Sequence, residues 1–421
     1  MINNKNKYRI NVFCYFLLLQ FQNKTGEKLE IQSIMNYTTS WHYPTSIRFG
    51  IGRIKELVDI CQELKMERPL IVTDSGIARL PMISQAIHTI KKNGLAVGIF
   101  SKTQTNPKSS NIYDGIHQYK EGHHDGVIAW GGGSAMDTGK LIAFLSAQTR
   151  SIWDFEDIDD NWKRGNQSNI APIVAIPTTS GTGSEVGRAA VVTNIETNTK
   201  KILFHPKMLP SIVICDPQLV VGLPANLTAW TGMDALAHCM ESYLAPGYHP
   251  MADGIALEGL KLIKEWLPIT VAEGENLDAR ANMMSAAAMG ATAFQKGLGA
   301  IHALSHPVGA HYDTHHGLTN AVFAPYVLQY NRPAIEERLE RLSRFLELKG
   351  HGYHAVINWL LCLREQFGIP HTTDQLGLEE NSLEKLAEMA ANDPTAATNP
   401  LPVGQEEMLK IYEASMTGEI D

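Results

Sequence analysis

Cysteine is scarce and scattered in this chain. The 421 residues contain five cysteines, and no two of them stand in a CxxC arrangement. They are Cys14, Cys61, Cys215, Cys239 and Cys362. The sequence therefore indicates neither a disulfide framework nor a cysteine-ligated zinc site. A reduced, cytoplasmic location is expected.

Long apolar runs are also missing. The longest near the N-terminus, residues 10–21, follows Lys5, Lys7 and Arg9 and is too short to cross a bilayer. No small-residue cleavage site of a signal peptide follows it. Met35 stands just before the first segment with a folded pattern, so we interpret residues 1–34 as an extension outside the fold. Export is the minor alternative, and no membrane partner is expected.

Positive charge is in deficit, with 36 Lys and Arg against 44 Asp and Glu and a net charge of -8. This balance argues against a nucleic-acid-binding surface and permits chemistry on small molecules. The hydrophobic fraction of 44% and the charged fraction of 19% are typical of a globular protein. No internal repeat or low-complexity tract occurs. The length favours two domains.

Short apolar runs alternate with helical stretches between residues 69 and 204. Strands are predicted at 69–74, 96–100, 126–130 and 173–176, with helices at 78–93 and 135–147. This alternation predicts a doubly wound parallel sheet. Beyond about Val221, helical spacing dominates. Helices are predicted at 230–243, 252–266, 279–294, 335–348 and 382–392. We therefore expect an α/β domain over 35–221 and a helical domain over 222–421.

Two glycine- and hydroxyl-rich loops each follow a predicted strand. Residues 131–140 read GGGSAMDTGK and open a helix, where glycines and backbone N–H groups suit a phosphate. The pattern is neither GxGxxG nor GxxxxGK[ST], so a tight strand-to-helix turn remains an alternative. Residues 177–185, PTTSGTGSE, form the second loop. Two such loops at the strand ends of one sheet favour an extended phosphate-bearing ligand.

Asp74 ends the first of these predicted strands. A carboxylate in this position can accept both ribose hydroxyls of an adenosine and repel a 2′-phosphate, which favours NAD(H) over NADP(H). The alternative is that Asp74 caps a helical turn beginning at the next residues.

Histidines gather between residues 297 and 320. Five of the chain's 16 lie there, at His302, His306, His311, His315 and His316. Upstream, DALAH places Asp234 and His238 one helical turn apart on a single face. Asp234 and His238, completed by His302 and His316, would make an oxygen and nitrogen site suited to Fe(II), Zn(II) or Mn(II). A His-rich surface loop and a surface Asp–His pair are the alternatives.

His306 stands one turn beyond His302 and precedes Pro307. If His306 has a function, its expected role is proton transfer between a bound alcohol and solvent. The alternative is a core histidine satisfied by hydrogen bonds. His311 and His315 are expected to be solvated or to lie around the ligands.

Taken together, these motifs resemble the iron-containing (group III) alcohol dehydrogenase family. The resemblance runs from about Tyr37 to the C-terminus, and residues 131–140, 177–186, 216–243 and 297–320 resemble its signature blocks in order and spacing. It implies an N-terminal Rossmann-like α/β domain and an all-α C-terminal domain of the dehydroquinate synthase-like type, with the active site in the cleft between them. The implied metal ligands are Asp234, His238, His302 and His316, and His306 matches the non-ligand histidine near the nicotinamide. The expected cofactor-binding residues are Asp74, Asn106, Gly131, Gly132, Gly133, Ser134, Asp137, Thr178 and Thr179.

The chain departs from the family pattern in two places. His315 stands before the last ligand, where proline is frequent, which leaves open whether His315 or His316 binds. The spacing of fourteen from His302 favours His316. Near the C-terminus the frequent Asn-Pro-Arg is replaced by residues 399–402, NPLP, so local packing there is expected to differ.

The resemblance implies hydride transfer between NAD(H) and a small primary alcohol or aldehyde. A divalent metal, Fe(II) or alternatively Zn(II), would polarise the substrate oxygen. A maleylacetate reductase or a glycerol dehydrogenase-like enzyme on the same scaffold is the nearest alternative, and a non-catalytic metal-binding scaffold is a more distant one. A homodimer or a higher homo-oligomer is expected.

Overall fold

The computed structural model describes residue 43 and residues 45–197 and 199–420, all of them within one compact unit that spans Thr39–Asp421. The predicted extension at residues 1–34 lies outside the described residues. Among the described residues, none of the helices combines the length and the hydropathy that a bilayer span requires.

A six-stranded sheet, parallel throughout, organises the first half of the described chain. Its strand order is β1-β8-β5-β4-β2-β3. The strands are β1 (Ser46–Phe49), β2 (Pro69–Asp74), β3 (Gly98–Thr103), β4 (Gly126–Gly131), β5 (Ile173–Pro177) and β8 (Ile212–Cys215). Four of them were predicted, although β3 begins two residues later than expected. The predicted doubly wound sheet is confirmed.

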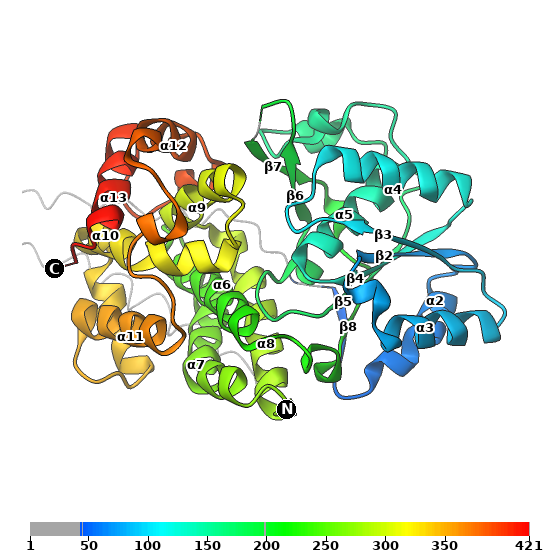
Figure 1. The fold of residues 1–421 in the computed structure, drawn as a ribbon, viewed down its shortest axis with the longest axis horizontal. Helices are drawn as coiled ribbons and strands as arrows, with labels where there is room; N and C mark the ends of the chain where they lie inside the picture. Colours follow the sequence, from blue (N-terminus) through cyan, green and yellow to red (C-terminus); the bar gives the residue numbers. More distant parts are fainter. Residues whose placement is uncertain (1–42, 44, 198, 421) are drawn as a thin grey trace, which may run out of the picture. The chain divides into compact units, whose positions relative to one another are not determined.

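Alternating residues of each central strand enter two separate cores. On β4, Val127 and Ala129 face one core, while Ile128 and Trp130 face the other. This pattern follows from the two-residue period of a strand that is buried on both faces. Helices α2 (Leu57–Glu63) and α3 (Pro81–Lys92) cover one face (Figure 1). Helices α4 (Ser109–Glu121) and α5 (Gly133–Leu145) cover the other (Figure 1).

An antiparallel hairpin, β6 (Ala189–Asn194) with β7 (Thr199–Phe204), interrupts this alternation after β5. Val192 and Leu203 are buried against Phe144 of α5 in a small core of their own. The hairpin was not predicted as a separate element. Its importance is positional, because several of its side chains line the cavity described below.

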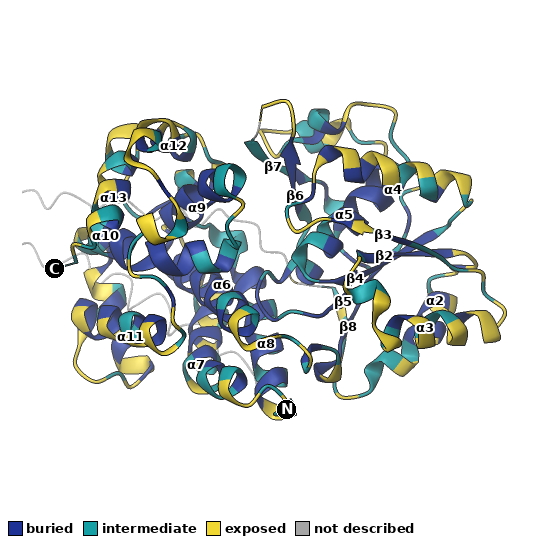
Figure 2. Ribbon diagram, in the orientation of Figure 1, coloured by how far each residue is buried: buried dark blue, intermediate teal, exposed yellow. Residues whose placement is uncertain are grey.

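The second half of the described chain is helical, as predicted, and its helices share one hydrophobic core. They are α6 (Ala225–Leu244), α7 (Pro250–Ala272), α8 (Leu277–Ala293), α9 (Ala300–Tyr312), α10 (His316–Phe345), α11 (Gly352–Gln366), α12 (Leu383–Ala391) and α13 (Gln405–Thr417). In Figure 2, α6 is buried along most of its length, like strand β4. The predicted helix at 335–348 overlaps only the last third of α10, because Pro325 and Pro333 interrupt the sequence pattern without ending the helix.

Candidate metal and cofactor site

Helix α6 presents three acidic or imidazole side chains on one buried face. Asp234, His238 and Glu241 follow each other at helical spacing, and Asp234 and Glu241 are only 2% and 6% exposed. Helix α10 approaches this face closely because Gly317 has no side chain. A Cβ at Gly317 would collide with the Trp230 carbonyl and lie 2.9 Å from the Asp234 Cβ. The glycine therefore lets the start of α10 reach Asp234.

Three imidazoles converge on one carboxylate oxygen. The Nε2 atoms of His316, His238 and His302 lie 3.6, 3.9 and 4.0 Å from Asp234 Oδ1. These separations are too long for hydrogen bonds. They are close to the roughly 3.4 Å between two ligands that each lie about 2.1 Å from a tetrahedral ion. The geometry therefore fits a shared divalent metal.

Within this set, Asp234, His302 and His316 form the tightest group, with ligand atoms all within 4.8 Å of one another. His238 reaches Asp234 but is not a member of that trio, and its ring stacks on His302 with centroids 4.8 Å apart. The structure thus brings all four predicted ligands together, three of them closely. Their role as ligands remains a prediction.

Two of the three imidazoles, those of His238 and His316, are held in the uncharged form that a metal ligand needs. Burial lowers the pKa of His238 to about 4 and that of His316 well below its usual value. Burial alone would also lower the pKa of His302, but the Glu241 carboxylate more than offsets this and raises it. The 2.5 Å contact between His302 Nδ1 and Glu241 Oε2 assigns the ring proton to Nδ1. When the His302 ring is neutral, its Nε2 lone pair lies on the side of Asp234.

Glu241 was not predicted as a site residue. Its other oxygen, Oε1, accepts the Ile301 backbone N–H at 2.7 Å, so one carboxylate fixes both the His302 ring and the first turn of α9. A carboxylate behind a metal-binding histidine is a recurrent arrangement that orients the ring and raises its basicity. The sequence feature that could have identified Glu241 is its position seven residues after Asp234, on the same face of α6.

His306, the predicted proton-transfer residue, is backed by a second unpredicted carboxylate. Its Nδ1 lies 2.7 Å from Asp393 Oδ2. Burial raises the pKa of Asp393, but His306 and two hydrogen bonds from Thr395 outweigh it and leave the pKa below its usual value. Asp393 is therefore ionised near neutrality and assigns the His306 proton to Nδ1. Nothing in the sequence between residues 306 and 393 marked this pair.

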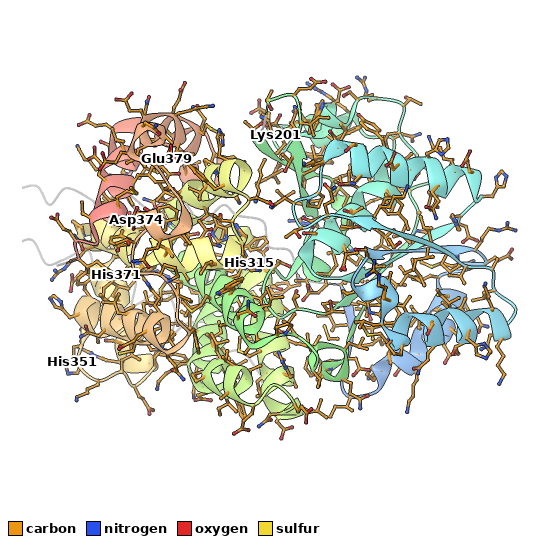
Figure 3. The ribbon with its side chains drawn as sticks, in the orientation of Figure 1. Lys201, His315, His351, His371, Asp374 and Glu379 are labelled. Carbon is orange, nitrogen blue, oxygen red and sulfur yellow. The ribbon has the colours of Figure 1, made fainter. Side chains whose placement is uncertain are left out.

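Of His315 and His316, the structure brings His316 toward Asp234, which favours His316 as the ligand. The His315 ring packs on Trp230 with centroids 5.1 Å apart, and Figure 3 shows it beside α6. His311 Nδ1 lies 3.3 Å from the Pro307 carbonyl oxygen, outside the trio, as expected for a residue that binds no metal.

The second departure from the family pattern, residues 399–402, still supports the site. Asn399 Oδ1 accepts the Ala300 backbone N–H at 3.1 Å, which satisfies a donor at the start of α9. Asn399 also exchanges hydrogen bonds with Asn331, at 2.7 and 2.9 Å. This edge of the helical half therefore anchors the helix that carries His302 and His306.

The four candidate ligands open into a cavity of about 490 Å³ that the sheet half and the helical half line together. From the sheet half, Asn106, Gly133, Ser134 and Asp137 line it, and His306 lines it from the other side. The predicted phosphate-binding loop and the predicted metal site therefore line the same cavity.

Lys200 of the hairpin also lines this cavity, and it was not predicted. Burial lowers its pKa to about 8, while the carboxylates of Asp313, Asp234 and Asp393 act in the opposite direction.

Glycine is required where the first loop leaves β4. Gly131 has φ +153°, and a Cβ there would lie 2.6 Å from the Ala135 Cβ. A Cβ on Gly133 would meet Thr182 Cγ2 at 2.6 Å, so the two glycine-rich loops pack against each other. A Cβ on Gly132 would similarly lie 3.3 Å from Thr179 Cγ2. The loops predicted from the sequence are neighbours.

Asp74, Gly131 and Thr178 lie together at the ends of their strands. The Thr178 N–H donates to the Gly131 carbonyl at 2.9 Å, and a Cβ on Gly131 would lie 3.8 Å from Asp74 Oδ2. Asp74 Oδ1 accepts the N–H groups of Gly76 and Ile77 at 2.8 and 2.9 Å. Asp74 therefore caps the following turn with one oxygen, as the alternative interpretation held. Its other oxygen remains turned toward the loop.

The remaining predicted cofactor residues already bond within the protein. Asp137 accepts hydrogen bonds from Ser184 Oγ at 2.5 Å and from the Val191 N–H at 2.9 Å. Asn106 Nδ2 donates to Asp313 Oδ1 at 2.5 Å, and Ser134 Oγ donates to the Thr105 carbonyl. Their cofactor contacts remain predictions.

The fold brings a candidate metal centre and a glycine-rich loop to one cavity, which is the arrangement of a metal-dependent dehydrogenase. Two family models match nearly all of the described chain: "Iron-containing alcohol dehydrogenase" over residues 44–217, and "Fe-containing alcohol dehydrogenase family, C-terminal" over residues 228–416. The chain belongs to the iron-containing alcohol dehydrogenase family.

Similar proteins of known activity and structure agree. The 4-hydroxybutyrate dehydrogenase of Cupriavidus necator is 38% identical over 385 residues, which cover 89% of this chain and 99% of that protein. An NAD-dependent methanol dehydrogenase of Bacillus methanolicus is 34% identical over 90% of this chain and 100% of that one. The crystal structure of a 1,3-propanediol oxidoreductase superposes with a TM-score of 0.85 at 33% identity, covering 90% of this chain and 100% of that chain.

These matches confirm the predicted family and the predicted fold. They also confirm the reaction class, hydride transfer between NAD(H) and an alcohol or aldehyde, with iron and NAD as cofactors.

Proposed function

We propose that this enzyme interconverts a small primary alcohol and its aldehyde at a metal centre held by Asp234, His238, His302 and His316. The observation that carries the proposal is the convergence of three imidazole Nε2 atoms on Asp234 Oδ1 inside the cavity that Gly133 and Ser134 also line. The substrates in the names of the relatives support a primary alcohol, since 4-hydroxybutyrate, methanol and 1,3-propanediol each carry a terminal hydroxyl group.

A divalent metal bound there would supply Lewis acidity to the substrate oxygen, and a bound nicotinamide would exchange the hydride. The protein positions and protects these groups. Glu241 orients His302, and Asp234, His238 and His302 are buried while His316 is half-buried. His306, with its proton fixed on Nδ1 by Asp393, offers Nε2 to take up the hydroxyl proton.

Residues at the loops form the proposed NAD site. Asp74, Gly131, Gly132, Thr178 and Thr179 lie together at the strand ends, which suits the adenosine and phosphate end of the dinucleotide. Asn106, Gly133, Ser134 and Asp137 line the cavity toward the ligands, which suits the nicotinamide end.

Substrate and metal identity are tested together. We expect purified enzyme to reduce NAD⁺ with a panel of straight-chain primary alcohols and to contain iron, with zinc as the alternative, near one ion per chain. Activity confined to glycerol, or to reduction of maleylacetate, would replace the primary-alcohol assignment by one of the two alternatives on this scaffold. A fully metallated protein with no turnover on any of these compounds would support a non-catalytic scaffold.

The preference for NAD(H) is tested by Asp74→Ser. Serine can still accept the N–H groups of Gly76 and Ile77, so the cap is retained and only the charge is lost. Because a like charge facing the 2′-phosphate is repulsive, and about 1.4–2.8 kcal/mol is expected where solvent screens it, the ratio of kcat/KM for NAD⁺ over NADP⁺ should fall by about tenfold to a hundredfold. Asp114→Ser, an exposed change on α4, is the control. An unchanged ratio would assign Asp74 to capping alone.

Three wider features are part of the proposal. The two-domain division near Val221 is supported by the separate hydrophobic cores of the sheet and helical halves. A homodimer or higher homo-oligomer is supported by the edge strand β1, whose last residue, Phe49, is exposed together with the nearby Ile51; sedimentation analysis tests it. A cytoplasmic location is supported by the free thiols of Cys61, Cys215, Cys239 and Cys362.

A further inference from the structure

Asn320 lies at the centre of the candidate metal site, although no feature of the sequence singled it out. It is on α10, one turn after His316, and is 0% exposed. Its Nδ2 donates to Asp234 Oδ1 at 2.9 Å and lies 3.2 Å from His316 Nε2 and 3.4 Å from His302 Nε2. The amide nitrogen thus touches the same three ligand atoms that form the tight trio.

The hydrogen bonding determines which way this amide faces. If nitrogen and oxygen were exchanged, the amide oxygen would lie 2.9 Å from a carboxylate oxygen, and two acceptors would oppose each other. The nitrogen therefore faces Asp234. The lone pair of an amide nitrogen is delocalised into the carbonyl group and is not available to a metal, so Asn320 acts through Asp234 rather than as a ligand.

Asp234 has little else to hold its carboxylate in place. Asp234 is only 2% exposed. Among residues 43, 45–197 and 199–420, Asn320 is the one residue that donates a hydrogen bond to it. The other two carboxylates of the site differ, because Glu241 also accepts the Ile301 N–H and Asp393 also accepts two bonds from Thr395. The direction of Asp234 Oδ1 therefore depends on Asn320.

Keeping this amide in the interior is costly. Its Oδ1 is buried and has no hydrogen-bond partner among the residues that the structure describes, and such a group is less favourable in the interior than an apolar one of the same shape. An aliphatic residue would pack there more favourably. The amide is thus an unfavourable choice for packing and a suitable one for orienting a neighbouring carboxylate.

We propose that Asn320 is a positioning residue of the metal centre, which holds Asp234 Oδ1 toward the three imidazoles and thereby sets the affinity of the site for its divalent ion. The inference rests on the ligand assignment proposed above. Hydrogen-bond partners of metal ligands typically contribute tenfold to a hundredfold in metal affinity, so an effect of about that size is expected.

The test measures metal affinity directly, by competition between the purified protein and a chromophoric chelator for Zn(II) and Co(II). Asn320→Leu keeps the branched shape of the side chain and removes the donor. We expect it to bind each ion about tenfold to a hundredfold more weakly than the wild-type protein. Asn320→Ala serves as a second variant, and the melting temperature of each metal-free variant verifies that it is folded.

Ser343→Ala is the matched control. Ser343 is also a buried polar residue of α10, but it bonds to the Gly352 N–H and the Glu340 carbonyl and does not line the cavity. We expect its metal affinity to stay within about twofold of the wild-type value, since none of its hydrogen bonds reaches a ligand. A folded Asn320→Leu protein with affinity no weaker than that of Ser343→Ala would overturn the proposal.

Two further measurements separate the ways in which the proposal can fail. The d–d spectrum of the Co(II)-loaded Asn320→Leu protein should keep the coordination number of the wild type; a lost ligand would make Asn320 a direct ligand and refute a positioning role. In parallel, Asp234→Ala tests the underlying assignment. If Asp234→Ala bound metal as tightly as the wild type, the ligand set would be overturned. If Asp234→Ala lost affinity and Asn320→Leu kept the wild-type affinity, only the role of Asn320 would be overturned.

Discussion

The Asp234→Ala variant is expected to lose its divalent metal on purification and its turnover with it. Asp234 Oδ1 is the atom that all three imidazoles approach, at 3.6–4.0 Å. Its carboxylate also supplies negative charge that offsets the positive charge of the ion. Because Lewis-acid stabilisation is worth several kcal/mol, we expect kcat/KM to fall by about a thousandfold or more. Metal analysis after gel filtration and steady-state rates with a primary alcohol measure the two losses.

His315→Ala is the control for this experiment. It removes an imidazole next to His316 whose ring packs on Trp230 and which is not part of the trio formed by Asp234, His302 and His316. We expect it to retain both metal and turnover. If instead His315→Ala lost the metal and Asp234→Ala kept it, the assignment of ligands would be wrong and the alternative pairing of His315 would have to be reconsidered.

Asp393→Asn is expected to lower kcat by about a hundredfold while leaving the bound metal in place. The carboxylate accepts the His306 Nδ1–H at 2.7 Å and so keeps the Nε2 lone pair of His306 directed at the cavity. An asparagine can donate to Nδ1 instead, which moves the ring proton to Nε2 and removes the acceptor for the hydroxyl proton. General acid–base steps contribute about 10²–10⁴-fold, and we expect an effect at the lower end because solvent can partly replace the histidine.

A double-mutant cycle distinguishes this mechanism from a structural defect. If Asp393 acts through His306, the Asp393→Asn change should cost almost nothing in a His306→Ala background. Equal losses in both backgrounds would show that Asp393 supports the enzyme in another way, for example by starting the helical turn over Pro394–Thr398. The profile of kcat against pH is the second readout, since removing the relay should flatten its acidic limb.

The elements of the fold were largely predictable because their signals are local. Each signal lies within a short stretch of neighbouring residues. Examples are the continuous apolar run of β5, the residues of β4 that alternate between its two buried faces, and the two glycine-rich loops. Local patterns failed where two elements interact. The hairpin β6–β7 has no clear pattern of its own, and α10 continues through Pro325 because neighbouring helices bury that segment.

The candidate site shows the same division. The sequence by itself determined which residues bring metal-binding chemistry, through the Asp234–His238 spacing, the histidines after residue 300 and the resemblance that these motifs carry. Only the tertiary structure decided which of His315 and His316 faces Asp234 and which buried groups stand behind the ligands. Glu241, Asn320 and Asp393 act across separations of 61, 86 and 87 residues. A hydrogen bond depends on the distance and direction between two atoms, and for partners so far apart along the chain these are set by how the helices pack.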